Sequence, residues 1–439
     1  MSTSGSLTLR ILVALFVPNL AFLAIHYAAR SLPVQPIRNR IAIAFQGGDL
    51  QADPRTLVAL DRLRGVEPFG DANALRMAIH RGPSPWRDAL APRMLKPADG
   101  VARHPAAELH GDVFGDILFD PHSGYSHRYW HGAVAVTSFL ISALPVPQAR
   151  MVLETAGYFL FLLMPLVACR VSPRLVVVLG VISGFGVWFS GPPFYGQSYA
   201  YAPAFLWSQA AAPLVVAFGR TARSPAGVVP LGLVLGAVAA FLEPMSGAFV
   251  LAGSLAFLAH YFSLRESLPG PAAFRLAALL LAALLAGVFA SVLFKQSVAA
   301  LVFGFQDTFG TFGMELRWRM GLTGQEVTLP HVARTVWASS IYLTFGSVPL
   351  ARFLSLATAA ALATGSLMAL LDLARHPRER LFDYLTLLAP VVLLPAWYVL
   401  LPSHTAIHAW ITVRLLYLPL ALSWVLLALS ARAVIGKSS

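Results

Sequence analysis

The residues best suited to chemistry gather in one stretch, 112–132. It combines acids, bases, a cation and aromatic rings, namely Asp112, Asp116, Asp120, His122, Tyr125, His127, Arg128, Tyr129, Trp130 and His131. Arg128 has a planar, permanently charged guanidinium that suits a phosphate. A belt of interfacial aromatic residues is the simpler interpretation, but such a belt needs neither an arginine nor three histidines. We therefore predict that this stretch binds a charged ligand.

A second group of such residues begins the last apolar segment. His404, His408 and Arg414 lie roughly on one side of a helix, provided that the helix already includes His404. An arginine inside a membrane helix costs about 2.5 kcal/mol or more, so it normally faces the bundle interior. Snorkelling of Arg414 to the interface is the simpler alternative. The residues that we predict to bind a donor phosphate or lipid are Arg128, His131, His404, His408 and Arg414.

Further polar side chains lie at the ends of apolar segments or between them. The residues that we predict to bind substrate are Tyr125, Tyr129, Trp130, Gln197, Tyr199, Glu243 and Arg317. Glu243 precedes Pro244 at a membrane boundary, where a carboxylate needs a cation or a proton, unless it simply reaches water. The segment that contains Arg317 also holds Gln306, Asp307, Glu315 and Arg319.

Three carboxylates are candidates for a general base. Asp49 follows two glycines, which allow the backbone to approach a ligand closely. Asp116 and Asp120 belong to the stretch described first. Asp53, in contrast, is explained by capping a short helix over 53–65. Which of Asp49, Asp116 and Asp120 acts as the base stays open at this level.

Neither a cofactor nor nucleotide chemistry is indicated. His127 and His131, like His404 and His408, have the i, i+4 spacing of paired metal ligands, but neither pair lies in a His-Glu-x-x-His motif. We expect no cofactor, with a divalent metal as the less favoured alternative. The chain contains no P-loop, dinucleotide fingerprint, nucleophile elbow or kinase signature, so ATP hydrolysis is not expected.

The composition requires these residues to be positioned by a membrane bundle. Of the 439 residues, 57% are hydrophobic and 12% are charged, whereas soluble domains have about 25% charged residues. Apolar windows long enough to cross a bilayer lie at 10–28, 150–169, 174–190, 203–219, 226–242, 245–262, 276–294, 347–373, 383–401 and 408–429. We predict an all-α polytopic membrane protein with about ten transmembrane helices, in which 132–146 and 334–346 are helices that lie at the interface or are partly embedded. The single cysteine, Cys169, excludes an internal disulfide.

The distribution of Lys and Arg predicts which ends of the spans face the cytoplasm. With the N-terminus inside, basic residues such as Arg170, Arg265, Arg375 and Arg432 fall on the cytoplasmic side, and the short outer connections carry neither Lys nor Arg. Both termini are then cytoplasmic. The net charge of +12 reports orientation and needs no nucleic-acid partner.

We treat 1–439 as a single membrane domain. An extracytoplasmic cap over 31–131 follows the first span and carries amphipathic surface helices, and a second extracytoplasmic segment covers 295–335. No period of 20–50 residues recurs along the chain, so repeat architectures are excluded.

This layout resembles the GT-C superfamily of integral-membrane glycosyltransferases. Two local motifs look like those of uncharacterised or pilin-modifying bacterial members. The first is Gly124-Tyr125 with Arg128-Tyr129-Trp130-His131-Gly132, and the second is Ile407-His408-Ala409-Trp410 with Thr412 and Arg414. The resemblance implies that the catalytic carboxylate lies soon after the first span, which Asp49 matches best, although the paired acidic motif of many members is missing. It also implies a polyprenyl-phosphate-linked monosaccharide as donor.

The expected function is therefore transfer of a monosaccharide from a polyprenyl-phosphate donor to an extracytoplasmic acceptor, which is a glycan, lipid or protein. A carboxylate general base would deprotonate the acceptor, while Arg and His stabilise the leaving phosphate. The protein would lie in a bacterial inner membrane with its active site facing the exterior. A transporter or flippase of lipid-linked glycans, another lipid-dependent transferase, and a structural partner in envelope synthesis are the alternatives.

Overall fold

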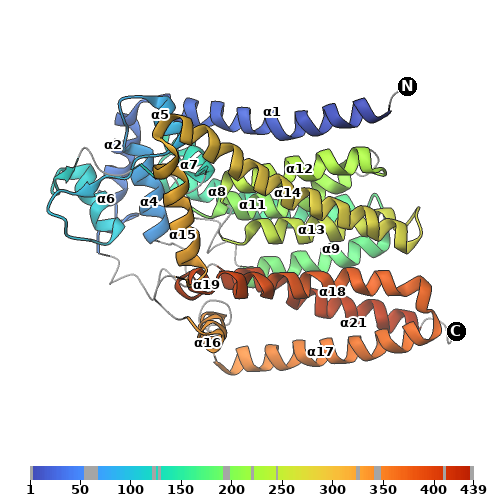
Figure 1. Ribbon diagram of the computed structural model, residues 1–439. Coiled ribbons are helices and arrows are strands. Elements are labelled where there is room, and N and C mark those ends of the chain that lie inside the picture. Colours follow the sequence, from blue (N-terminus) through green and yellow to red (C-terminus); the bar gives the residue numbers. More distant parts are fainter. Residues whose placement is uncertain are drawn as a thin grey trace.

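The structure, a computed structural model, is almost entirely helical. It describes residues 3–53, 68–120, 125–126, 130–190, 198–218, 222–243, 246–322, 327–340, 348–408 and 412–435. Two short antiparallel strands, β1 (Lys96–Pro97) and β2 (Phe119–Asp120), form a small sheet in which Lys96 lies opposite Asp120. The helices separate into a long bundle and a smaller group at one end of it (Figure 1).

The bundle contains the long apolar helices. They are α1 (Thr3–Ser31), α8 (Val146–Ala168), α9 (Pro173–Phe185), α11 (Ala202–Ala217), α12 (Pro225–Leu242), α13 (Ala248–Leu264), α14 (Gly270–Phe303), α17 (Val348–Arg375), α18 (Pro377–Leu400) and α21 (Tyr417–Ile435). The π-helical turn η2 (Gly186–Ser190) extends α9, and the 3₁₀ turn η5 (Val413–Leu416) precedes α21. Both termini lie at the same end of the bundle (Figure 1).

Seven helices of the described chain are long and apolar enough to cross a membrane. They are α1, α8, α12, α14, α17, α18 and the segment Val413–Arg432. The chain is therefore a polytopic, membrane-embedded, all-α protein. Three of the predicted spans coincide with the shorter apolar helices α9, α11 and α13, which have 13, 16 and 17 residues. The count of ten spans stays a prediction.

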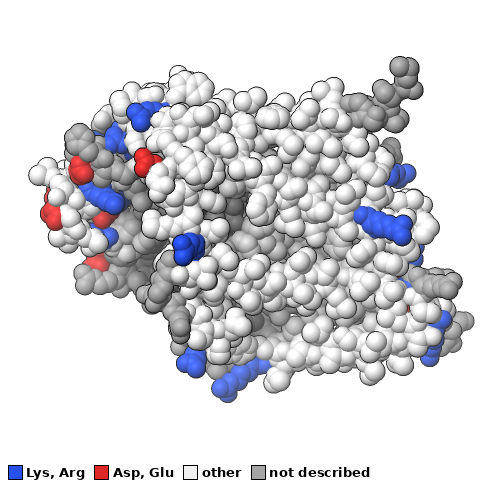
Figure 2. Space-filling model, viewed as in Figure 1, with Lys and Arg blue, Asp and Glu red and all other residues white. Residues whose placement is uncertain are grey.

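The bundle exposes apolar side chains that water would not tolerate. On α1, Leu9, Phe16 and Leu20 are each at least half exposed, and so are Phe159 of α8 and Leu356 of α17. Figure 2 shows a broad belt almost free of Lys, Arg, Asp and Glu, with charges at the two ends of the molecule. Such a belt has the character expected of a surface in contact with lipid.

Small residues allow α12 and α14 to pack closely. A Cβ atom at Gly232 would approach the Leu280 carbonyl oxygen to 2.7 Å, and one at Gly236 would collide with the carbonyl of Leu284. In the reverse direction, Gly287 leaves room for the backbone of Leu233. The two α12 glycines have the GxxxG spacing that lets membrane helices pack backbone against backbone.

Gly236→Ala is expected to destabilise the bundle by about 1–3 kcal/mol, because the added methyl group overpacks the contact with Leu284. Gly180→Ala in α9 is the matched control, since a Cβ there meets nothing within 4 Å. Alanine also favours a helix over glycine by about 1 kcal/mol. Thermal melting of the detergent-purified proteins should therefore move down for Gly236→Ala and stay level or rise for Gly180→Ala. Equal shifts for the two variants would contradict the packing argument.

The smaller group of elements, which we call the cap, covers one end of the bundle. It contains α2 (Val34–Gln46), α4 (Pro68–Ile79), α5 (Pro85–Leu90), α6 (Pro105–Phe114) and the two strands. Ile37, Ile41, Leu75, Ile79 and Leu109 form its apolar core, together with residues of α8 and of α7 (Gly132–Ala143). Helix α4 agrees with the surface helices that we predicted for the cap, whereas the one predicted over 53–65 lies mostly outside the described residues.

A buried carboxylate ties the cap to the bundle. Asp71 of α4 accepts hydrogen bonds from Ser198 Oγ at 2.8 Å and from the Tyr199 backbone at 2.9 Å, and it pairs with Arg150 of α8 at 3.1 Å. Burial raises the pKa of Asp71, while Arg150 opposes that shift. Because Asp71 contacts two bundle segments, it fixes how the cap sits on the bundle.

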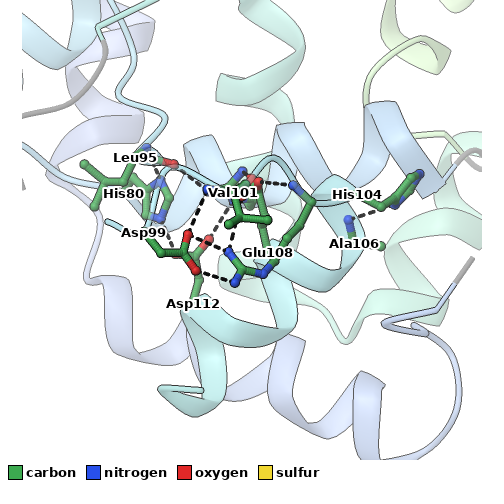
Figure 3. Close-up of polar contacts among 10 residues, drawn as sticks. His80, Leu95, Asp99, Val101, His104, Ala106, Glu108 and Asp112 are labelled. Carbon is green, nitrogen blue, oxygen red and sulfur yellow. Dashed lines mark hydrogen bonds and ion pairs between the residues drawn. The ribbon is translucent and has the colours of Figure 1, made fainter. Parts of the chain in front are cut away.

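Arg76 organises the inside of the cap. Its Nε lies 2.7 Å from Asp112, its Nη1 donates to Glu108, and its Nη2 donates to the Leu95 carbonyl at 2.6 Å. His80 Nδ1 accepts from the Leu95 backbone at 3.2 Å, and His80 Nε2 lies 2.8 Å from Asp112 (Figure 3). Burial lowers the pKa of His80, which agrees with a neutral ring whose Nδ1 is an acceptor. Asp112, part of the reactive stretch in the sequence, thus has a structural role here.

Helix α14 extends beyond the predicted span 276–294. It ends at Phe303, within the segment 295–335 that we predicted to be extracytoplasmic. Beyond it lie the π-helical turn η3 (Gln306–Gly310), α15 (Thr311–Arg319) and α16 (Leu329–Ser340). The short helix α19 (Pro402–Ile407) packs against α15 and α16.

Candidate functional site

A partly enclosed cavity of about 130 Å³ lies between the cap and the adjoining ends of bundle helices. We call it the junction pocket. Its polar lining residues are Asn73, Ser126, His131, Tyr201, Glu243, Arg319, His404 and His408. These residues come from parts of the chain as distant in sequence as α4 and α19, so only the tertiary fold brings them together.

The sequence Trp130-His131-Gly132 accounts for the position of His131. Trp130 is 1% exposed and donates from Nε1 to Ser291 Oγ at 3.1 Å, which anchors the segment in the bundle. Gly132 packs against the end of α12, where a Cβ would lie 2.5 Å from the Phe241 carbonyl oxygen. Between these two anchors His131 adopts φ = 56°, a left-handed conformation that costs about 1–2 kcal/mol for a residue with a side chain.

His131 thereby faces the junction pocket, where its Nε2 lies 3.0 Å from Ser126 Oγ. Within the described chain it is the one residue other than glycine with positive φ. Strain of this kind persists where the surrounding packing over-determines it, and it is concentrated at functional sites.

Arg319 lines the pocket with His404 of α19 and with His408, the residue that follows α19. His404 and His408 are one helical turn apart, with ring centroids separated by 4.6 Å. Arg319 Nη1 donates to His404 Nδ1, and Glu315 accepts from Arg319 Nε at 3.0 Å. A guanidinium only donates, so we infer that the neutral ring of His404 carries its proton on Nε2. Arg319 is 4% exposed and held from two sides, which pre-organises a buried cation at the pocket.

Glu243 supplies a carboxylate to the pocket. It follows the last residue of α12 and is 7% exposed. The carboxyl end of a helix carries partial negative charge, so a carboxylate at that position is electrostatically disfavoured. Helix capping therefore does not explain Glu243, in contrast to an acid at a helix N-terminus.

Two helix N-termini complete the electrostatics of the junction pocket. Helix α7 begins at Gly132 and α11 begins at Ala202, and residues at both starts line the cavity. Backbone N–H groups at such ends carry partial positive charge and favour anions. Together with Arg319 they make one side of the pocket suitable for a phosphate, while Glu243 provides a base.

Four predicted site residues meet in this pocket. His131, His404 and His408, predicted to bind a donor phosphate, all line it, and so does Glu243, predicted to bind substrate. The two sequence clusters on which the prediction depended are therefore brought together beneath the cap.

The three predicted bases lie elsewhere. Asp49 is exposed after the end of α2, and its backbone oxygen accepts a hydrogen bond from Arg150 at 3.1 Å. Asp116 is exposed and lies 3.2 Å from His110. Asp120 belongs to β2, opposite Lys96. These three carboxylates lie outside the lining of the junction pocket, which includes Glu243. Their role as the base stays a prediction.

Three predicted substrate-binding aromatics have packing roles instead. The Trp130 ring is enclosed by His26, Phe294 and other rings of the bundle. Tyr199 is fully buried, and its hydroxyl donates to the Val146 carbonyl at 2.7 Å. Tyr125 packs against Phe303, with a centroid distance of 4.9 Å. The buried rings of Trp130 and Tyr199 therefore have no exposed face for a sugar, whereas Tyr125 is partly exposed.

Two predicted arginines also lie outside the pocket lining. Arg317 is exposed on α15, whereas Arg319 is buried. Residues two positions apart point to opposite sides of a helix, so Arg317 faces away from the pocket that Arg319 lines. Arg414 is buried in η5, on the chain that leads away from α19. The remaining predicted residues, Arg128, Tyr129 and Gln197, lie outside the described residues.

Sequence reasoning did not single out Asn73, Ser126, Tyr201 and Arg319 as site residues. Arg319 carried the clearest signal, because Glu315 precedes it by one helical turn and such a pair marks one face of a helix. Asn73 and Ser126 carried no distinguishing signal. Among the described residues, no group of three or more His, Cys, Asp and Glu side chains is arranged to hold a metal ion.

The comparisons with known proteins do not extend this picture: the chain matches no protein-family model, no curated protein and no solved structure at a significant level.

Proposed function

We propose that the chain is a membrane glycosyltransferase that moves a monosaccharide from a polyprenyl-phosphate donor to an acceptor hydroxyl of a glycan, lipid or protein. The observation that carries the proposal is the convergence of Glu243, Arg319 and three histidines in one pocket between a polar cap and an apolar bundle. A donor that is hydrocarbon at one end and sugar phosphate at the other suits that boundary.

In the proposed reaction Glu243 is the general base. Its carboxylate accepts the proton of the acceptor hydroxyl while that oxygen bonds to the anomeric carbon of the sugar. The bond from the anomeric carbon to the phosphate oxygen breaks, and its electron pair leaves with polyprenyl phosphate. The proton then passes from Glu243 to solvent. General base catalysis contributes about 10²–10⁴-fold to such a rate.

Arg319 would stabilise the leaving phosphate. Negative charge grows on that phosphate as the glycosidic bond breaks, so a fixed cation stabilises the transition state more than the ground state. Glu315 and His404 hold the guanidinium in place, and the N-termini of α7 and α11 add partial positive charge. His131 and His408 would bind the sugar or phosphate oxygens.

The hydrocarbon chain would pack against the bundle near α16. A second cavity of about 130 Å³ there is lined almost entirely by apolar and aromatic side chains, including Trp188, Trp337 and Trp424. Helix α16 contributes Trp337 to this cavity and also contacts α19, which carries His404. The same helix therefore adjoins both the proposed phosphate site and an apolar crevice.

The proposed orientation places the cap outside a bacterial inner membrane. Arg170, Arg265, Arg375 and Arg432 lie at the helix ends remote from the cap, in agreement with an excess of basic residues in cytoplasmic connections. Both termini would then be cytoplasmic, and the junction pocket would open towards the exterior.

Arg319→Ala is expected to lower transfer by about 100- to 1,000-fold, the usual effect of removing one donor that stabilises transition-state charge. The measurement is transfer of radiolabelled sugar from a polyprenyl-phosphate donor by purified protein in lipid vesicles. Arg334→Ala is the matched control, since Arg334 is exposed on α16 and does not line the pocket. No transfer by the unaltered protein with any donor of this class, or full activity of Arg319→Ala, would contradict the proposal.

A second candidate function, transport of a lipid-linked glycan, is favoured by one observation. The bundle buries Lys295, Gln296 and Asn19, and Ser291 Oγ donates to Asn19 Oδ1 at 2.6 Å. Polar residues inside a membrane bundle mark transport pathways. Movement of a fluorescent lipid-linked glycan across vesicles, without sugar transfer, would support this candidate over the transferase.

A further inference from the structure

A large polar cavity lies at the end of the bundle remote from the cap. Its volume is about 490 Å³, within the ordinary range for ligand sites. The charged residues that line it are Arg174, Arg265, Glu266, Arg380, Asp383 and Arg432. They come from the start of α9, the end of α13, the start of α18 and the end of α21, and we call this the arginine cavity. It has no part in the proposed transfer reaction.

Two of its four arginines are already paired. Arg265 Nε lies 3.1 Å from Asp383 Oδ1, and Arg380 Nη1 lies 3.6 Å from Asp383 Oδ2. Behind the lining, Asp372 accepts from the Tyr384 hydroxyl at 2.9 Å and lies 3.5 Å from Arg380. These contacts build a rigid wall and neutralise both aspartates.

Arg174 and Arg432 are the other two arginines that line the cavity. Among the described residues, no carboxylate lies within ion-pair distance of either guanidinium. The four arginines carry four positive charges, and Glu266, Asp383 and the adjacent Asp372 carry three negative charges, so the cavity has one net positive charge. On the face that Figure 2 shows, this end of the molecule displays Lys and Arg with almost no acid.

Part of the cavity lining is apolar. Phe262 and Leu387, which are buried, and Leu429 line it together with the charged residues. A site that combines guanidinium groups with hydrocarbon side chains matches a ligand whose phosphate lies at the membrane surface. The tendency of basic residues to collect on one membrane side explains the arginines, but it requires neither a cavity nor a wall of paired side chains.

We propose that the arginine cavity binds a phosphate ester, with Arg174 and Arg432 as the phosphate ligands. In the described part of the chain these two guanidinium groups have no acidic partner, and a guanidinium offers a phosphate bidentate donors, which an ammonium group does not. An anionic lipid head group and a soluble phosphate ester share this chemistry, and the experiment separates them.

The test uses the full chain purified in detergent, with native mass spectrometry to count retained lipids. The probes are phosphatidylglycerol and phosphatidylcholine for the lipid source, and glycerol phosphate and inorganic phosphate for the soluble source. We expect the unaltered protein to retain phosphatidylglycerol over phosphatidylcholine, or else to bind glycerol phosphate or inorganic phosphate in solution. The first result identifies a lipid head group and the second a soluble ester. If neither occurs, the proposal is overturned without recourse to any variant.

The paired variants locate the site. Arg174→Gln with Arg432→Gln is expected to weaken binding tenfold or more, because charge-assisted hydrogen bonds contribute about 1.5–3 kcal/mol each. Arg223→Gln with Arg375→Gln removes the same charge from the same end of the bundle without touching the cavity lining, and should alter binding less than twofold. An equal loss in the two double variants would show that only general surface charge acts. Sugar transfer should be unchanged in both, so failure of this proposal leaves the proposed function standing.

Discussion

Glu243→Gln is expected to lower sugar transfer by about 100- to 10,000-fold, because glutamine keeps the shape of the side chain and removes its basicity. Glu243 is the carboxylate that lines the junction pocket, and it lies at a helix end that disfavours negative charge. The measurement is the initial rate of transfer from a radiolabelled polyprenyl-phosphate sugar, with donor binding measured separately. A base acts on the rate, so binding of the donor should change far less than turnover.

Asp49→Asn tests the rival assignment in the same assay. Asp49 is the base that the resemblance to GT-C enzymes implies, but its side chain lies at the exposed end of α2. We expect Asp49→Asn to melt at the same temperature as the unaltered protein and to transfer sugar at a similar rate. The opposite pattern, with Asp49→Asn inactive and Glu243→Gln active, would return the base to the first loop.

Arg76→Leu is expected to destabilise the cap by about 3–5 kcal/mol, the usual cost of removing one partner of a buried ion pair. Arg76 is 2% exposed, and its loss would leave the buried carboxylates of Glu108 and Asp112 without their cation. The measurement is the rate of limited proteolysis within 68–120, together with thermal melting. Cleavage in the cap should accelerate while the bundle helices stay protected.

Arg103→Leu provides the control for this second prediction. Arg103 also forms an ion pair in the cap, with Asp99, but both side chains are exposed to water (Figure 3 includes Asp99). Exposed pairs contribute little to stability, so this variant should be cleaved at the rate of the unaltered protein. Equal acceleration in the two variants would mean that burial is not what makes Arg76 important.

The candidate site was partly predictable because its polar residues stand out against an apolar sequence. His404 and His408 are conspicuous at the start of an apolar segment, and their i, i+4 spacing correctly placed them on one side of a helix. His131 was conspicuous in a reactive stretch. The local sequence did not show which side chains are buried. Trp130 and Tyr199 have the residue types of a sugar site, but both are buried in packing contacts.

The sequence by itself determined that the chain is an all-α membrane protein, because each apolar window is a local property of contiguous residues and burial in lipid follows from length and hydropathy. The tertiary structure alone decided which acid faces the histidines and which arginine joins them. Gly132 packing on Phe241 brings the start of α7 to the end of α12, so Glu243 and His131 share a pocket that excludes Asp49. The rotation of α15 then turns Arg319 inward and Arg317 outward, since contacts between distant helices, and not local spacing, choose the buried face.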